Sequence, residues 1–364
     1  MNAPSTTSGT DFLKIDGSHG EGGGQVIRTA VSLAAITGIA IEISNIRAGR
    51  RKPGLQAQHL TSVRAAAAIC NAALDGDQLD SVNLQFSPKA GNGAGLGDHV
   101  FDVSRARGGS SAGSASLVAQ TIIAPMLHRM LVENRGETKI TVRGGTHVPM
   151  APCVDYIEIV YLPALSKLGH NVNLKVTKAG FFPRGGGEIE LVFNQSTPHQ
   201  PLDSVSRGRL QYFKAIVTTS GLKETVAERA AEVVKKELKG YGVPISVEHR
   251  NLQSSGEGAA VLLTAECSNA TCGWTALGER GKPIERVAAE AIKQFQLWYP
   301  THCGVDEHLS DQLILPCALA GIKSQWSTPV ISEHLRTVIW IVNQFLEVPI
   351  KLQETDGVGK VTVG

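Results

Sequence analysis

The period of the hydrophobic positions changes several times along the chain, and the order of these changes repeats. Apolar residues recur every three to four positions in some stretches, which predicts helices, and every second position in others, which predicts strands. The first group reads strand, helix, strand, helix and strand, at 12–15, 25–36, 39–46, 55–73 and 82–86. Helices that alternate with strands in this way predict an α/β (α+β) fold.

The same order of elements returns twice. The second group has strands at 99–103, 139–142, 172–177 and 188–193 and helices at 114–130 and 154–168. The third has helices at 307–320 and 333–345 and strands at 350–354 and 359–363. Three βαβαββ units predict a pseudo-threefold domain, on the order of elements alone, because no residue-level identity between the units is evident.

A polar stretch, Asn194 to Arg209, separates the second group from a segment with its own pattern. That segment predicts strands at 212–218, 245–249 and 259–265 and helices at 225–238 and 283–298. We therefore expect a flexible tail at 1–11, a discontinuous catalytic domain at 12–204 and 301–364, and an inserted α/β domain at 205–300. The length of 364 residues also favours two domains over one core.

Composition and charge narrow the class of protein. The 35 Lys and Arg residues nearly balance 33 Asp and Glu residues, which excludes a protein that coats nucleic acid by bulk charge and leaves only local contacts. The six cysteines form no CxxC pair, so they predict reduced thiols in an intracellular protein of the nucleus or cytoplasm and give a zinc site no support. The longest apolar stretch, 117–131, contains Gln120, Pro125, His128 and Arg129, which predicts a core helix and no membrane span.

A glycine-rich loop, Gly20 to Gln25, runs directly into the first predicted helix. Free backbone N–H groups at a helix start favour anions, although the loop matches neither the P-loop nor the GxGxxG pattern. Glu21 within it is a candidate ligand for a divalent metal, and Arg28 in the helix is a candidate partner for the same phosphates. The alternative is a plain turn with a solvated salt bridge.

Three loops occupy the same place, between a strand and the second helix of each group. Residues 47–52 hold four cations in six positions, which indicates either a phosphate site or a solvated basic loop. Ligand groups of α/β proteins gather where strands lead into helices, so we expect Arg50, Pro152 and His334 to converge on one face. His334 and His308 taken singly are more typical of surface or capped histidines than of catalytic residues.

Several co-linear motifs taken together resemble the RNA 3'-terminal phosphate cyclase family. The motifs are DGSHGEGGGQ at 16–25, IRAGR at 46–50, PGLQAQHL at 53–60, SAGS at 111–114, GGT at 144–146, FPRGGG at 182–187, DQL at 311–313 and ETDG at 354–357. The resemblance covers nearly the whole chain and is weakest in the proposed insert. It implies three repeats like the C-terminal domain of a translation initiation factor, with a smaller α/β domain inserted after the second.

The resemblance also implies roles for individual residues. His334, in the His334-Leu335-Arg336-Thr337 context, would be adenylated, and Glu21 would bind the metal. Phosphates would be engaged by four side chains, Arg28, Arg50, Gln58 and Gln120, and adenosine by Pro152 and Asp311. Position 308 holds a histidine where relatives often place a tyrosine against the adenine, and Val338 stands where Asn is common.

The implied function is ATP-dependent conversion of an RNA 3'-phosphate into a 2',3'-cyclic phosphate, through a covalent histidine-AMP and an RNA(3')pp(5')A intermediate. It would require ATP and a divalent metal, Mg or Mn, with RNA bearing a 3'-phosphate end as partner; no membrane and no obligate protein partner are inferred. Three alternatives stay open: a catalytically inactive relative that acts in ribosome biogenesis, an enolpyruvyl transferase of broadly similar architecture, and an RNA-binding protein without chemistry.

Overall fold

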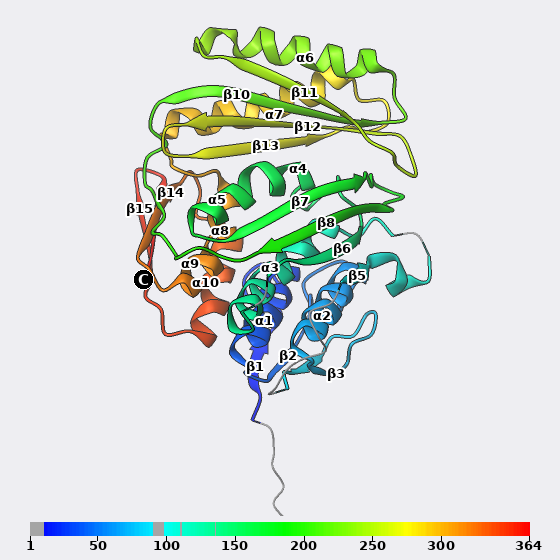
Figure 1. The fold of residues 1–364 in the computed structure, drawn as a ribbon, viewed down its shortest axis with the longest axis vertical. Helices are drawn as coiled ribbons and strands as arrows, with labels where there is room; N and C mark the ends of the chain where they lie inside the picture. Colours follow the sequence, from blue (N-terminus) through cyan, green and yellow to red (C-terminus); the bar gives the residue numbers. More distant parts are fainter. Residues whose placement is uncertain (1–10, 90–97, 110, 135) are drawn as a thin grey trace, which may run out of the picture.

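The computed structural model describes residues 11–89, 98–109, 111–134 and 136–364. The predicted flexible tail at 1–11 lies outside this part of the chain, apart from Asp11. Figure 1 shows a mixed α/β protein with several small sheets, in agreement with the predicted class.

Three of the sheets have four strands each and share one strand order. In each sheet the first two strands pair in parallel and the other neighbours pair antiparallel. The first sheet contains, in spatial order, β1 (Leu13–Asp16), β2 (Ile41–Ser44), β4 (Leu84–Ser87) and β3 (Ala73–Asp75). The second contains β5 (His99–Asp102), β6 (Thr138–Gly144), β8 (Gly187–Asn194) and β7 (Asn171–Lys178). The third contains β9 (Asp203–Ser204), β14 (Ser324–Thr328), β16 (Val358–Val363) and β15 (Ile350–Thr355).

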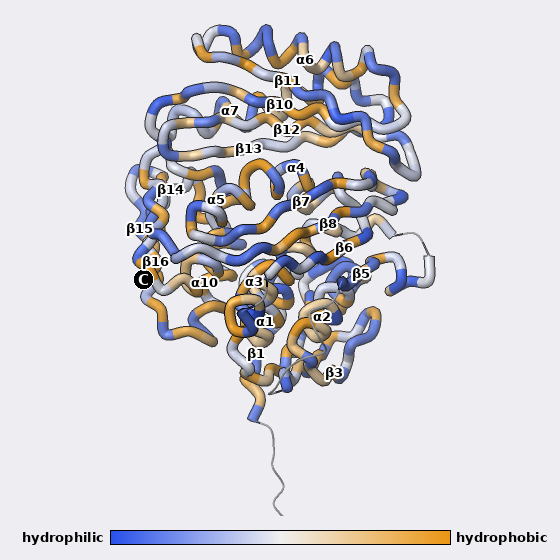
Figure 2. Tube along the Cα trace, viewed as in Figure 1, coloured by the Kyte–Doolittle hydropathy of each residue, from blue (hydrophilic) through white to orange (hydrophobic). Residues whose placement is uncertain are grey.

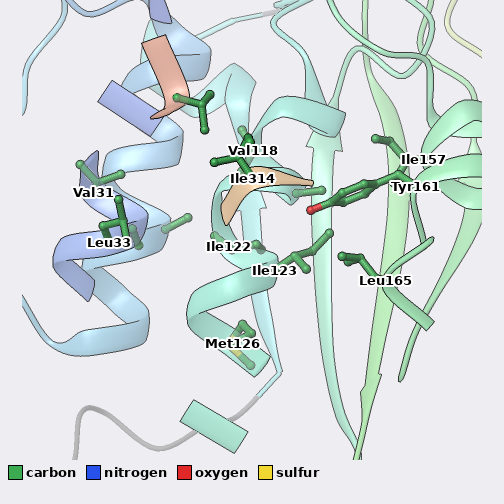
Figure 3. Packing of buried hydrophobic residues seen from close by; sticks show 14 of the residues in the cluster. Val31, Leu33, Val118, Ile122, Ile123, Met126, Ile157, Tyr161, Leu165 and Ile314 are labelled. Atoms are coloured by element: carbon green, nitrogen blue, oxygen red, sulfur yellow. The ribbon is translucent and has the colours of Figure 1, made fainter. Parts of the chain in front are cut away.

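The helices that follow these strands pack on one another. α1 (Gly24–Thr37) contacts α2 (Ala57–Cys70), α3 (Ala115–Val132) and α10 (Glu333–Phe345). Figure 3 shows Val31 and Leu33 on α1 and Val118 and Ile122 on the neighbouring helix α3. All four residues belong to the larger hydrophobic core. Because helices from all three sheets share this core, the loops at their N-terminal ends are held in fixed relation to one another.

α3 carries the apolar stretch that the sequence assigned to a core helix. Among the described residues it is the one helix long and apolar enough to cross a membrane, and 72% of it is buried inside the protein. Its Thr121 carbonyl accepts a hydrogen bond from Ser32 of α1, and its Thr121 hydroxyl contacts Ser62 of α2. These contacts are those of a helix packed inside a protein core.

The fourth sheet has the order β11-β10-β12-β13 and a separate hydrophobic core. Its elements are β10 (Leu210–Ser220), α6 (Glu224–Leu238), β11 (Ile245–Asn251), β12 (Gly258–Cys267), β13 (Thr271–Leu277) and α7 (Ile284–Trp298), with short 3-10 turns η3 (Lys239–Tyr241) and η4 (Tyr299–Thr301). α6 buries residues three or four apart, so hydrophilic and hydrophobic positions alternate along it in Figure 2. In Figure 1 this sheet lies above β7, next to α4.

Two predicted helices are interrupted, each one turn before a proline. The segment predicted at 154–168 consists of α4 (Val154–Tyr156), a π-helical turn η2 (Ile157–Tyr161) and α5 (Leu162–Lys167), and the one predicted at 307–320 consists of α8 (Glu307–Gln312) and α9 (Ile314–Ala320). Pro163 and Pro316 lack the N–H that would bond the carbonyl four residues earlier, so regular α-helical bonding fails there.

Four strands were not predicted, namely β3, β9, β13 and β14. β3 and β9 have three and two residues, too few for a period to show. β14 has the sequence SQWST, whose polar residues are buried by pairing with β9 and β16. The remaining predicted helices and strands are confirmed, with ends shifted by a few residues.

Candidate active site

The glycine-rich loop between β1 and α1 lies against α10. The His19 ring stacks on Trp340 with a distance of 3.7 Å between ring centroids. A Cβ at Gly20 would lie 2.4 Å from the Thr337 hydroxyl, so a larger residue there would push the loop away. The loop is therefore in direct contact with the second turn of α10, next to the first turn, which contains His334.

Glu21 joins two predicted site residues from different loops. Its Oε2 lies 3.1 Å from Nε2 of His334 and 3.0 Å from Nη2 of Arg50. A Cβ at Gly23 would lie only 2.2 Å from the Glu21 carboxylate and 2.8 Å from the Arg50 guanidinium, so a glycine is needed for this approach. The hydrogen bond with His334 lowers the pKa of Glu21 and raises the pKa of His334, so the contact favours the protonated form of the imidazole.

Arg28 and His59 lie beside this cluster. A Cβ at Gly24 would lie 2.2 Å from His59 Nε2 and 2.8 Å from Arg28 Nη1. Burial lowers the pKa of Arg28 to about 10, which leaves it charged at neutral pH, and burial lowers the pKa of His59 well below its usual value. His59 Nδ1 also accepts a 3.2 Å hydrogen bond from the Gln56 N–H at the start of α2. Its sequence position gave no sign of this close packing against Arg28.

A pocket of about 570 Å³ opens next to His334. Six of the predicted site residues line it: Arg28, Gln120, Pro152, His308, Asp311 and His334. The volume is within the range of about 300–1,000 Å³ that small-molecule sites occupy. The expected convergence of the loops is therefore observed, with Pro152 and His334 lining one pocket and Arg50 reaching His334 through Glu21.

Gln58 lies outside the pocket lining but is linked to it. Its Oε1 accepts a 2.9 Å hydrogen bond from the N–H of Ser114, whose hydroxyl lies 2.7 Å from that of Ser116. Ser116 in turn donates a 2.6 Å hydrogen bond to the carbonyl of Pro152. The start of α3 thus connects Gln58 in α2 with the pocket loop that contains Pro152.

Asp306 fixes the helix that presents His308 and Asp311. It is fully buried, and its Oδ1 accepts the backbone N–H groups of His308 and Leu309 at 3.0 and 2.9 Å. Its Oδ2 accepts from the N–H of Gly273 in β13 at 3.2 Å. The short helix α8 is therefore held by a carboxylate that is also bonded to the fourth sheet.

Burial raises the pKa of Asp311 to about 6, and electrostatic interactions with His334, His308 and Arg28 oppose the shift. Gln312 beside it lines the pocket, and its buried Oε1 has no hydrogen-bond partner among the residues the structure describes. Both side chains are therefore acceptors available to a bound ligand.

A buried ionic cluster holds the pocket loop at 143–152. His147 Nε2 and Asp155 Oδ2 are 2.8 Å apart, and both side chains are at most 1% exposed. Thr218 and Arg250, from the strands of the fourth sheet, donate to the Asp155 carboxylate at 2.8 and 3.0 Å. The loop that carries Pro152 is therefore anchored from both sides.

The sequence prediction missed the contribution of the fourth sheet to the pocket. Gly273, Thr275, Leu277 and Gln294 line it together with Tyr156 and Tyr161. The apolar residues of β13 and α7 indicate only which side chains pack in the core of the fourth sheet. They do not indicate which edge of that sheet lies against the rest of the protein.

The described residues contain no group of three or more His, Cys, Asp or Glu side chains that could hold a metal by themselves. Glu21 is a single carboxylate next to a group of cations. Magnesium is commonly held by one or two carboxylates together with substrate phosphates, so the donor set fits a metal shared with a bound polyphosphate. The six cysteines are free thiols.

Fold and site together define a mixed α/β protein with a pocket of small-molecule size and a histidine, a carboxylate and arginines at its edge. The family model described as RNA 3'-terminal phosphate cyclase matches residues 19–352. The chain belongs to this family, as its motifs predicted.

Curated relatives agree with this assignment. The RNA 3'-terminal phosphate cyclase of Nostoc punctiforme is 43% identical over 350 residues, which covers 96% of this chain and 99% of the relative. The proteins of the same name from Methylococcus capsulatus and Pyrobaculum neutrophilum are 42% identical (97% of this chain, 96% of the relative) and 38% identical (95% and 99%). Each of these relatives bears the enzyme's name, so the chain is assigned to the enzymes of the family.

Proposed function

We propose that this protein converts an RNA 3'-phosphate into a 2',3'-cyclic phosphate at the expense of ATP, through a covalent histidine-AMP. The observation that supports it best is the position of His334, which lines the 570 Å³ pocket and contacts Glu21. A nucleophile at the edge of a nucleotide-sized pocket, with arginines beside it, is the arrangement that nucleotidyl transfer requires.

ATP binding would use the two sides of the site differently. Adenosine would lie in the pocket against Pro152 and His308, with Asp311 as an acceptor for a ribose hydroxyl. The triphosphate would extend toward Arg28, Arg50, Gln58 and Gln120. Glu21 would hold a divalent metal, Mg or Mn, jointly with the phosphates, and the metal would supply charge neutralisation to the leaving pyrophosphate.

In the first step, neutral His334 would attack the α-phosphorus. A nitrogen–phosphorus bond forms, the bond to the β-phosphate oxygen breaks, and pyrophosphate leaves with the electron pair. The imidazole must first lose the proton that its contact with Glu21 stabilises. A Glu21 carboxylate engaged by a divalent cation would no longer stabilise the imidazolium, so the His334 proton would pass to solvent.

In the second step, an oxygen of the RNA 3'-phosphate would attack the histidine-bound phosphorus and free His334, giving RNA(3')pp(5')A. The adjacent 2'-hydroxyl would then attack the 3'-phosphorus, lose its proton and displace AMP. Nucleophile and leaving group sit on one ribose in this last step, so positioning alone supplies much of the acceleration.

The proposal includes the architecture. The three sheets of equal order would be repeats of one βαβαββ unit, like the C-terminal domain of a translation initiation factor, forming a catalytic domain at 12–204 and 301–364. Residues 205–300 would be the insert. The protein would act inside the cell, in the nucleus or cytoplasm.

The test is incubation with α-labelled ATP and a divalent metal, followed by denaturing electrophoresis of wild type, His334→Ala and His308→Ala. An acid-labile label that is lost only in His334→Ala supports the proposal. An unlabelled wild type, with ATP and metal shown to be competent, would favour the alternative of an inactive relative acting in ribosome biogenesis.

A further inference from the structure

Exposed cations gather beside the Glu21 cluster on a surface that adenylation does not use. This basic face consists of Arg51 and Lys52, in the loop after β2, and of Arg105 and Arg107, in the 3-10 turn η1 (Val103–Arg107). All four side chains are exposed, and none of them lines the nucleotide pocket.

The two parts of the basic face are joined by a direct contact. Arg107 Nη2 donates a 2.8 Å hydrogen bond to Oε1 of Gln56, the residue that precedes α2. η1 packs on α2, and α2 and β5 lie side by side in Figure 1. Cations that are more than 50 residues apart in sequence therefore share one surface.

Acidic groups around the basic face are already engaged. Asp80 accepts a 2.8 Å hydrogen bond from the Gln56 amide, and Asp102 accepts from the Ser104 N–H at 2.9 Å as the cap of η1. Glu21 is paired with Arg50, the direct neighbour of Arg51. The four cations of the face outnumber these carboxylates, so the face presents net positive charge to solvent.

Its position relative to His334 indicates what it binds. Arg50 connects the face to Glu21 and through it to His334, at the phosphate end of the site. The adenosine pocket extends the other way, toward α8 and the fourth sheet. A polyanion that lies on the face would deliver one end to the reacting histidine without entering the adenosine pocket.

We propose that the basic face is the docking surface for the single-stranded RNA that leads to the 3'-phosphate. This inference rests on the proposed function, because only an RNA end must reach His334. The four side chains are cations without an aromatic among them, so they would neutralise backbone phosphates and read no sequence. Binding would be sensitive to salt and tolerant of sequence.

The experiment compares two triple charge reversals of equal size. Arg51→Glu/Lys52→Glu/Arg105→Glu alters the face and spares Arg107, whose contact with Gln56 supports α2. Lys235→Glu/Lys236→Glu/Lys239→Glu alters exposed lysines of α6 and the turn after it, and serves as the matched control. Dissociation constants are measured for a single-stranded decanucleotide and for a dinucleotide, both with 3'-phosphates, over a series of salt concentrations.

The face variant should bind the decanucleotide at least about tenfold more weakly, and its salt slope should fall by about 0.7 for each lost phosphate contact. Its affinity for the dinucleotide and its labelling by ATP should match the control. An equal loss in the control, or a decanucleotide affinity that the face variant retains, would overturn the proposal, as would wild-type binding that does not respond to salt.

Labelling by ATP without RNA separates this inference from the proposed function. A wild type that takes no label contradicts the histidine-AMP mechanism, whatever the decanucleotide result. If the wild type is labelled but the face variant binds the decanucleotide as tightly as the wild type does, only the proposed RNA docking surface is contradicted. If the triple variant fails to fold, the decanucleotide affinity of Arg105→Glu and the salt dependence of wild-type binding test the docking surface instead.

Discussion

The hydroxyl of Tyr156 donates a 2.8 Å hydrogen bond to Oδ1 of Asp306, a residue 150 positions further along the chain. Tyr156 lines the pocket next to His334, and Asp306 caps α8, which carries His308 and Asp311. One buried contact therefore fixes two walls of the pocket relative to each other.

Tyr156→Phe should separate these walls without removing a group that reacts. Loss of a buried hydrogen bond to a carboxylate should lower the free energy of unfolding by about 1–2 kcal/mol. The KM for ATP should rise several-fold, with a smaller change in kcat. Denaturant unfolding and steady-state adenylation measure the two effects.

Tyr212→Phe is the matched control, because it removes a hydroxyl contact to Glu266 on the fourth sheet, away from the pocket. It should leave the KM for ATP unchanged. A Tyr156→Phe enzyme with wild-type KM would show that the Asp306 contact does not position the nucleotide residues.

The contact between His334 and Glu21 should govern the protonation of the nucleophile. The hydrogen bond to Glu21 raises the pKa of His334, so the imidazolium of the free enzyme persists to higher pH. In Glu21→Gln the charged partner is lost, and the His334 pKa should fall. Histidine titration by NMR on metal-free protein measures the shift, with the other histidines as internal references; an unchanged His334 pKa would contradict the assignment.

Asp311 should make stability fall as pH rises. Its folded-state pKa of about 6, against an ordinary 3.8, means that the folded protein holds this proton more tightly than the unfolded chain does. The unfavourable contribution of Asp311 is therefore absent below the ordinary pKa and grows as pH rises through about 6.

Asp311→Asn should accordingly stabilise the free protein by about 3 kcal/mol at pH 8 and have little effect near pH 4. The same variant should bind ATP more weakly if Asp311 accepts from the ribose. Urea unfolding at the two pH values checks the first effect, and equal stability changes at both would refute the raised pKa.

Sequence patterns foretold the elements that have a clear period of their own. α6 and α7 have buried residues three and four apart, and α1 and α10 begin where the pattern placed them. β14 was not predicted because its sequence has no alternation of apolar and polar residues. Its Ser and Thr side chains are buried because neighbouring strands pack beside them. Pro163 and Pro316 were visible, but the apolar period ran through them and concealed the interruptions.

The sequence predicted those parts of the site that depend on where a residue lies relative to its own strand and helix. Loops at equivalent strand ends brought Arg50, Pro152 and His334 to one region, and the motifs singled out Glu21. What the sequence could not supply is contact between units that are far apart in the chain. Gly273, Thr275 and Gln294 enter the pocket because the fourth sheet packs beside it, which is a property of tertiary packing alone.

Loss of Arg50 should slow adenylation without changing the covalent product. It pairs with Glu21 at 3.0 Å and is 37% exposed at its side chain, so it is accessible to a phosphate that replaces this partner. Removing one group that stabilises transition-state charge costs about a hundredfold to a thousandfold in rate. Arg50→Ala should therefore form the same acid-labile histidine adduct more slowly. Arg51 is the exposed neighbour of Arg50, and Arg51→Ala should react at the wild-type rate. Single-turnover labelling with α-labelled ATP compares the three proteins, and a normal rate in Arg50→Ala would exclude Arg50 from the phosphate site.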